Sequence, residues 1–105
     1  MYVLVVYVPM SHINEVKQAM FDQGAGKIGD YEHCCWQVEG IGQFRALKGA
    51  QPFVGEINDV HKEPEMRIEL MLTDDEIKPA LNAMIDAHPY EEPAYHYYAV
   101  NSALE

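Results

Sequence analysis

The sequence predicts an α+β domain of the ferredoxin-like type, in which an antiparallel sheet carries two helices on one face. Two observations lead to this fold class. Residues 2–8 are a continuous run of β-branched and aromatic side chains, which is typical of a central strand covered on both faces. When that run is counted first and the hairpin expected at residues 33–47 is counted as one element, the segments read as strand, helix, strand, strand, helix, strand. We therefore expect one βαββαβ domain over residues 1–103.

The first helix is expected at about residues 12–23. Pro9 ends the preceding strand, Ser11 is placed to cap the helix, and Gly24 suits the left-handed conformation that closes one. The apolar residues of the segment recur at helical spacing and share one face: Ile13, Val16, Met20 and Phe21.

A hairpin is expected in the middle of the chain. Residues 33–38 alternate as a strand does, Gly40-Ile41-Gly42 offers a tight reversal, and residues 43–47 would return as the paired strand. The segment 48–59 contains glycine and proline and has no sustained period, so we expect a loop there. Its length favours a functional role.

Two further strands are expected in the second half. Residues 65–73 alternate between apolar and polar side chains, which indicates a strand with one buried face. The tyrosine-rich residues 95–100 are expected to close the domain as its last strand.

The second helix lies between these two strands. Thr73 and Glu76 form a capping-box pattern at its start. Pro79 removes a backbone donor, so we expect regular helix only from about Lys78. The helix should stop before Pro89, because the residue preceding a proline disfavours helical geometry.

Charge and composition exclude several kinds of partner. Seven Lys and Arg against seventeen Asp and Glu give a formal net charge of −10 with neutral histidines. Such a surface repels phosphate backbones and anionic lipids, so we expect neither a nucleic acid nor a membrane as partner. Cys34 and Cys35 are adjacent and do not form an ordinary structural disulfide, which fits a cytoplasmic protein. Leu104 and Glu105 fit a residue pair left by an expression tag.

Motifs for phosphate binding or covalent catalysis do not fit their required contexts. Residues 24–29 match the letters of the dinucleotide fingerprint, but they follow a helix and open a strand, which inverts the required order. A cysteine nucleophile is disfavoured, because a strand-borne Cys34 or Cys35 lacks the helix N-terminus that commonly lowers the pKa of a thiol. An enzyme therefore ranks last, since no acid–base pair can be placed within reach.

A divalent-metal site is the alternative that the histidines and cysteines leave open. His33 and Cys35 share one face of the expected strand, and His88 would approach them only through the fold. The metal of this hypothesis is Zn²⁺ or Cu²⁺, and no other cofactor is expected. His88 also has a structural use, because a cation at a helix C-terminus interacts favourably with the dipole.

Three segments carry a family resemblance: residues 24–34 (GAGKIGDYEHC), 49–55 (GAQPFVG) and 88–95 (HPYEEPAY). Together they resemble the YqfO family, and specifically the PII/CutA-like domain inserted in the middle of those longer proteins. The family's pair of metal ions is bound by the two flanking halves, which this sequence lacks, so dimetal hydrolase chemistry is not implied. Related PII proteins bind nucleotide with a long loop between the second and third strands. The corresponding turn here, Glu39 to Gly42, is short, so ATP binding is not implied either.

The resemblance implies a non-enzymatic, oligomeric binding or regulatory domain of the PII/CutA-like type. We expect a homotrimer, because PII and CutA proteins assemble with their sheets facing a central axis. Association also fits the first strand, which has no polar face and so should need covering. A small molecule or metal is expected to bind where the three family-like loops meet. The candidate binding residues are Gly29, Asp30, Tyr31, His33, Gly49, Pro52, His88, Tyr90, Glu91 and Glu92.

Overall fold

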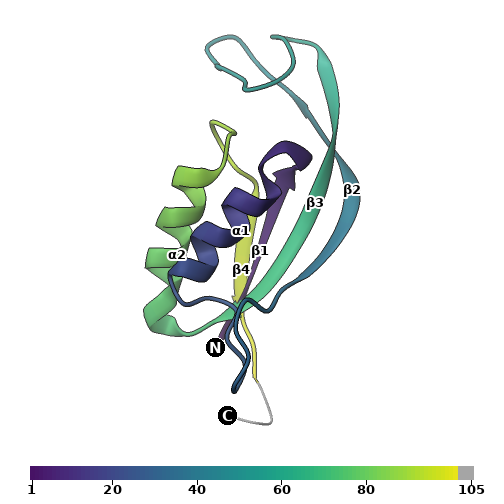
Figure 1. Cartoon of the computed structure of the whole chain (residues 1–105). Helices are drawn as coiled ribbons and strands as arrows, with labels where there is room; N and C mark the ends of the chain where they lie inside the picture. Colours follow the sequence, from purple (N-terminus) through teal and green to yellow (C-terminus); the bar gives the residue numbers. More distant parts are fainter. Residues whose placement is uncertain (102–105) are drawn as a thin grey trace.

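Four strands and two helices follow one another along residues 1–101, the part of the chain that the computed structural model describes (Figure 1). This order confirms the α+β class and the ferredoxin-like arrangement. Leu104 and Glu105, assigned above to a tag, lie outside the described residues. The elements are β1 (Tyr2–Pro9), a 3-10 turn (Met10–His12), α1 (Ile13–Asp22), β2 (Trp36–Arg45), β3 (Val60–Leu72), α2 (Asp74–Ala87) and β4 (Tyr95–Ala99).

The sheet is antiparallel throughout and has the strand order β2-β3-β1-β4. β1 lies inside the sheet, between β3 and β4, and its register with β3 runs from Tyr2 opposite Leu72 to Pro9 opposite Glu65. Both edges of β1 are therefore hydrogen-bonded, which suits its valine-rich sequence.

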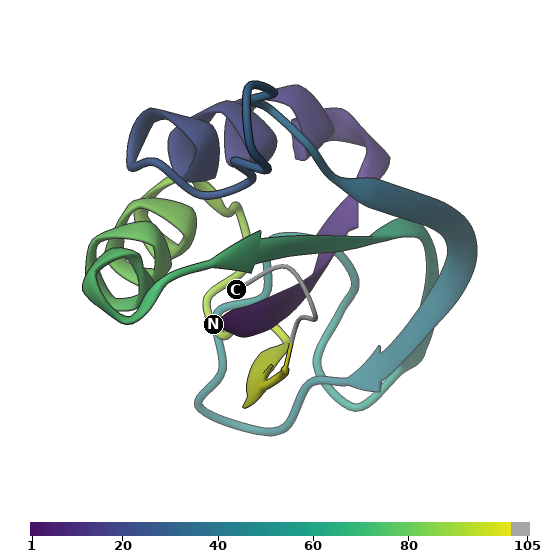
Figure 2. The same cartoon turned by 90° about the horizontal axis from the view of Figure 1, so that it is seen from below.

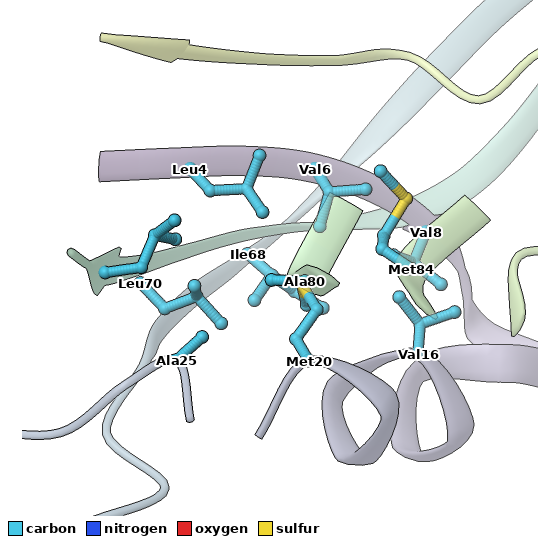
Figure 3. Close-up of a cluster of buried hydrophobic side chains, with 11 residues drawn as sticks. Leu4, Val6, Val8, Val16, Met20, Ala25, Ile68, Leu70, Ala80 and Met84 are labelled. Carbon is cyan, nitrogen blue, oxygen red and sulfur yellow. The ribbon is translucent and has the colours of Figure 1, made fainter. Parts of the chain in front are cut away.

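Both helices cover the same face of the sheet (Figures 1 and 2). Alternate residues of β1 point toward them, and the apolar stripes of α1 and α2 meet those residues from the other side (Figure 3). The buried core consists of Leu4, Val6, Val8, Val16, Met20, Ala25, Ile68, Leu70, Leu72, Ala80 and Met84.

The predicted hairpin turn at Gly40-Ile41-Gly42 is wrong. These residues continue β2, which pairs with β3 along its whole length from Trp36 to Arg45. The backbone groups of the two glycines are satisfied by this ladder, and residues 46–59 form the true connection. β3 pairs with β1 only from Glu65 onward, whereas its pairing with β2 begins at Val60. The first part of β3 and the last part of β2 therefore extend beyond the rest of the sheet as a two-stranded ribbon.

The first helix agrees with its prediction except at its cap. Ser11 lies in the 3-10 turn, where its Oγ is hydrogen-bonded to Nδ1 of His12 at 2.7 Å, and no side chain caps α1. The intervening turn moves the first helical residue to Ile13. Gly24 has a φ of +95°, as expected for the left-handed end of a helix.

The second helix starts earlier than predicted, at Asp74 rather than near Lys78. The backbone N–H of Thr73 donates to Oε1 of Glu76 at 2.8 Å, which stabilises the first turn. Pro79 lies inside the helix, where its missing N–H removes only one intrahelical bond. No helix within residues 1–101 has both the length and the apolar character needed to cross a membrane.

The helix-free face of the sheet is partly covered by its own side chains. Val5 points to this face and is fully buried, with Glu69 and His96 opposite it on the neighbouring strands. Nε of Arg67 donates to Oε1 of Glu69 at 2.8 Å, and the Arg67 guanidinium lies 5.8 Å from the ring centre of Tyr7. The polar side chains of β3 thus cover the apolar residues of β1.

Apolar side chains on the edge strands β2 and β4 remain exposed on this face. Trp36 is 62% exposed, and Val38 and Tyr98 are also exposed. The register places Trp36 and Val38 opposite Glu69 and Arg67, on the helix-free side. The part of this face that still lacks cover is therefore smaller than the first strand alone suggested.

Candidate functional site

A cavity of about 410 Å³ lies between the β2–β3 connection, residues 46–59, and the α2–β4 connection, residues 88–94. Figure 1 shows both connections at the same end of the molecule. Three aromatic rings and three carboxylates stand out among the lining residues. The lining comprises Gln43, Phe44, Arg45, Ala46, Leu47, Ala50, Pro52, Phe53, Glu65, Tyr90, Glu91, Glu92 and Ala94.

Tyr90 occupies the middle of this aromatic group. Its ring centre lies 6.1 Å from that of Phe44 and 6.2 Å from that of Phe53. The Tyr90 hydroxyl donates to Oε2 of Glu65 at 2.8 Å. Burial, followed by this hydrogen bond and the nearby carboxylate charge, raises the pKa of Tyr90 far above its ordinary value. Tyr90 is therefore a protonated donor that holds the Glu65 carboxylate in place.

His88 anchors the loop that carries Tyr90. The ring is only 6% exposed, and its Nε2 lies 2.7 Å from the carbonyl oxygen of Tyr7. Because a carbonyl only accepts, Nε2 carries the proton; Nδ1 in turn accepts from the backbone N–H of Tyr90 at 3.1 Å. Burial lowers the pKa of His88, so the neutral ring is favoured. With both ring nitrogens engaged, His88 is a structural residue in this fold.

A backbone hydrogen bond also joins the two loops across the cavity. The N–H of Gln51 donates to Oε1 of Glu91 at 3.2 Å. Phe53, in the same connection as Gln51, also packs edge-to-face on His12 at 5.6 Å, which joins that connection to the 3-10 turn. The cavity is therefore bounded by segments that are far apart in the sequence.

Gly42 leaves the space that the Glu65 side chain occupies. A Cβ added at Gly42 would collide with the carboxylate of Glu65, whereas a Cβ at Gly40 would meet open space. The Glu65 side chain thus crosses the ribbon over Gly42 to reach the Tyr90 hydroxyl. The glycine is explained by this close approach rather than by a turn.

Replacing Gly42 with alanine is expected to displace the Glu65 carboxylate and break its bond to Tyr90. The free energy of unfolding should fall by about 1–2 kcal/mol relative to Gly40→Ala, the matched control in the same strand. Urea unfolding of the two variants measures this difference. Equal stability would show that Glu65 reaches Tyr90 equally well over a methyl group.

The structure brings together one part of the predicted site. Pro52, Tyr90, Glu91 and Glu92 line the cavity, and His88 supports it from behind. Gly49 lies in the same connection with a φ of +101°, where glycine is strongly favoured.

The other predicted loop lies at the opposite end of the sheet. Gly29, Asp30, Tyr31 and His33 belong to the α1–β2 connection, whose Gly26 N–H donates to the carbonyl of Met71, near the far end of β3 from Glu65. Met71 and Glu65 are about 20 Å apart at the rise of a β-strand. The prediction that all three loops meet is therefore wrong, because α1 returns the chain to the other end of the sheet.

The metal candidates are likewise separated. His33 stacks on Phe21 with ring centres 4.8 Å apart, and its φ of 59° places it outside any strand. Cys35 packs against the core, and His88 lies at the other end of the sheet. Within residues 1–101, no three His, Cys, Asp or Glu side chains gather closely enough to hold a metal ion. The expected strand face shared by His33 and Cys35 does not form, because β2 starts only at Trp36.

The predicted site residues did not include Phe44, Phe53 and Glu65, the three missed residues that matter most for the chemistry of the cavity. Phe44 and Glu65 come together through the ribbon, which the false hairpin turn concealed. Phe53 lies inside the family-like segment 49–55 and had a usable signal in the sequence, an aromatic residue in a long loop. The connection between the second and third strands is also long, residues 46–59, rather than the short turn expected at Glu39 to Gly42, so its length does not weigh against nucleotide binding.

The sequence and the fold of this chain were compared with those of known proteins. The chain is 45% identical over 97 residues to a "GTP cyclohydrolase 1 type 2 homolog" from Bacillus subtilis, covering 92% of this chain and 26% of that protein. A Bacillus cereus protein related to NIF3 superposes with a TM-score of 0.82 at 37% identity, covering 96% of this chain and 26% of that one. The PII-like protein CutA from Nostoc sp. PCC 7120 superposes with a TM-score of 0.64 at 16% identity, covering 100% and 86%. No protein-family model matches the sequence.

The sheet order, the helix layer and the similarity to CutA define a PII/CutA-like domain. The relatives narrow this further: the chain corresponds to one domain of NIF3-related proteins, which agrees with the resemblance to the YqfO family that the three loop segments suggested. It spans about a quarter of the length of the curated relatives that it matches.

Proposed function

We propose that this chain is a non-enzymatic, homo-oligomeric binding domain that holds a small organic molecule between the β2–β3 and α2–β4 connections. The observation that carries the proposal is the 410 Å³ cavity. Its volume falls within the range of small-molecule sites, and its walls combine apolar surface with a few polar groups.

The lining favours binding over catalysis. Among the described residues that line the cavity there is no serine, threonine, cysteine, histidine or lysine, the side chains that most often serve as nucleophiles. The Tyr90 phenol is engaged with Glu65, and its raised pKa opposes transfer of its proton. The cyclohydrolase name belongs to relatives of which this chain spans about a quarter, so it does not carry over to the domain.

The exposed aromatic side chains on the edge strands of the helix-free face support self-association. Trp36 and Tyr98 are large, rigid and half-exposed, on either side of the Arg67–Glu69 pair. Tryptophan, tyrosine and arginine are the residues that dominate protein interfaces. A homotrimer with these faces turned inward is the assembly that the PII/CutA resemblance favours.

Native mass spectrometry of the untagged protein, purified from the cells that produce it, tests both parts of the proposal. We expect a homotrimer at micromolar concentration, with an added mass that is released on denaturation. Trp36→Glu should yield smaller particles, because it places a charge in the interface, whereas Ile85→Glu on the exposed side of α2 should not. A monomer without added mass would overturn the proposal, and a dimer would reject only the threefold symmetry.

A further inference from the structure

We infer that the cavity is selective for an organic cation, a molecule in which an ammonium or guanidinium group is attached to an apolar body. This inference rests on the proposed function and adds the chemical class of the ligand. Three independent features of the cavity lead to it: its aromatic walls, the sign of its side-chain charges, and its size.

The aromatic walls suit a positively charged group. Tyr90 lies between Phe44 and Phe53, with ring centres 6.1 Å and 6.2 Å away. Aromatic faces attract cations through the ring quadrupole, and this attraction strengthens as the cation loses water. Phe53 is 53% exposed, so a large apolar ring stands partly in solvent beside the cavity. A bound ligand would cover it.

The carboxylates set the sign of the cavity's charge. Glu65, Glu91 and Glu92 all line it. Glu65 accepts one bond from Tyr90, and Oε1 of Glu91 accepts one from Gln51, so each has further acceptor capacity. Glu92 is exposed at the rim.

Arg45 is the one cationic residue among the described residues that line the cavity, and it shares this lining with three carboxylates. Its Nε donates to the carbonyl oxygen of Asn58 at 2.8 Å, so part of the guanidinium is already engaged with the backbone. The lining therefore keeps an excess of negative charge, which opposes a polyphosphate or carboxylate ligand.

The size of the cavity selects an organic ligand over a bare ion. A volume of about 410 Å³ is that of a site for a small organic molecule, and much of its lining is apolar, including Leu47, Ala50, Pro52 and Ala94. The charged head would meet the carboxylates and rings, while the apolar body would cover these side chains.

Calorimetric titration with three probes of similar size tests the inference: benzylammonium, benzyl alcohol and benzoate. We expect the cation to bind about ten-fold more tightly than the alcohol, from the cation–π and charge contributions, and benzoate to bind least. Phe53→Leu and Glu92→Gln should each weaken binding of the cation several-fold. Glu39→Gln, which removes an exposed carboxylate of β2 outside the cavity, is the matched control and should leave binding unchanged.

The outcomes separate this inference from the proposed function. If benzyl alcohol or benzoate binds as tightly as the cation and Phe53→Leu weakens it, the cavity binds small molecules but is not selective for cations, and only the inference is wrong. If none of the probes binds, the inference is also wrong, and the mass retained in native mass spectrometry decides the proposed function separately. Equal effects of Glu92→Gln and Glu39→Gln would show a general charge effect and would overturn the assigned role of the cavity carboxylates.

Discussion

Replacing Ile68 with alanine is expected to lower the free energy of unfolding by about 2–5 kcal/mol, the largest effect that we predict. Ile68 is fully buried in β3, the strand that joins β1 to the ribbon, and it packs in the core beneath both helices. Truncation removes apolar contacts and leaves a cavity that a sheet held by ladders on both sides cannot readily close.

Ile41→Ala is the matched control, because it makes the same chemical change on a neighbouring strand. Ile41 is 76% exposed, so its truncation should change stability by less than about 0.5 kcal/mol. Urea unfolding at one fixed protein concentration compares the two, since oligomerisation makes the midpoint depend on concentration. Similar losses for both variants would mean that Ile41 is buried in the assembled protein.

Acid is expected to destabilise the fold through His88. Burial lowers the pKa of the folded ring below 6.5, so the unfolded chain takes up this proton at a higher pH than the folded protein. Stability contributed by the neutral ring is complete above pH 6.5 and is lost as the pH falls toward the folded pKa, by at most about 1.4 kcal/mol per pH unit. Protonation also places a hydrogen on Nδ1, facing the N–H of Tyr90.

His88→Gln separates this effect from the titration of other groups. Its amide N–H can still donate toward the carbonyl of Tyr7, but the acceptor for Tyr90 is lost, so we expect a cost of about 1–3 kcal/mol at pH 8 and a flatter dependence of stability on pH. His96→Gln, on the exposed strand β4, is the control and should keep the wild-type slope. Thermal or urea unfolding between pH 8 and pH 5 supplies the comparison. An unchanged slope in His88→Gln would assign the acid sensitivity to another group.

Local sequence patterns were sufficient to predict those elements whose structure depends only on residues that are close together in the sequence. The valine-rich β1, the stripe Val16 and Met20 on α1, and the pair Thr73 and Glu76 at the start of α2 all follow from periodicity or capping within a few residues. The family-like segment 88–95 also contained residues of the cavity, namely Tyr90, Glu91 and Glu92. Helix and strand order then followed, since the connections between them are simple.

The errors arose where a residue's role depends on a distant strand. Gly40 and Gly42 read as a turn, because glycine is common in turns and nothing nearby contradicts one. Both glycines lie in β2 and pair with β3. Position 42 suits glycine because the Glu65 side chain crosses it to reach Tyr90. Neither the pairing with β3 nor the close approach of Glu65 can be predicted from the residues that surround these glycines in the sequence.

The sequence by itself therefore determined the fold class, the helix-covered face and the loop that carries Tyr90, because hydrophobic periodicity and capping act over short distances. Only the tertiary structure decided which loops share an end of the sheet. The antiparallel register of β2 with β3 brings residues 46–59 to the α2–β4 connection, while α1 carries the segment from Gly29 to His33 to the opposite end. The physical reason is that backbone ladders set distances over the whole length of a strand, which no local pattern encodes.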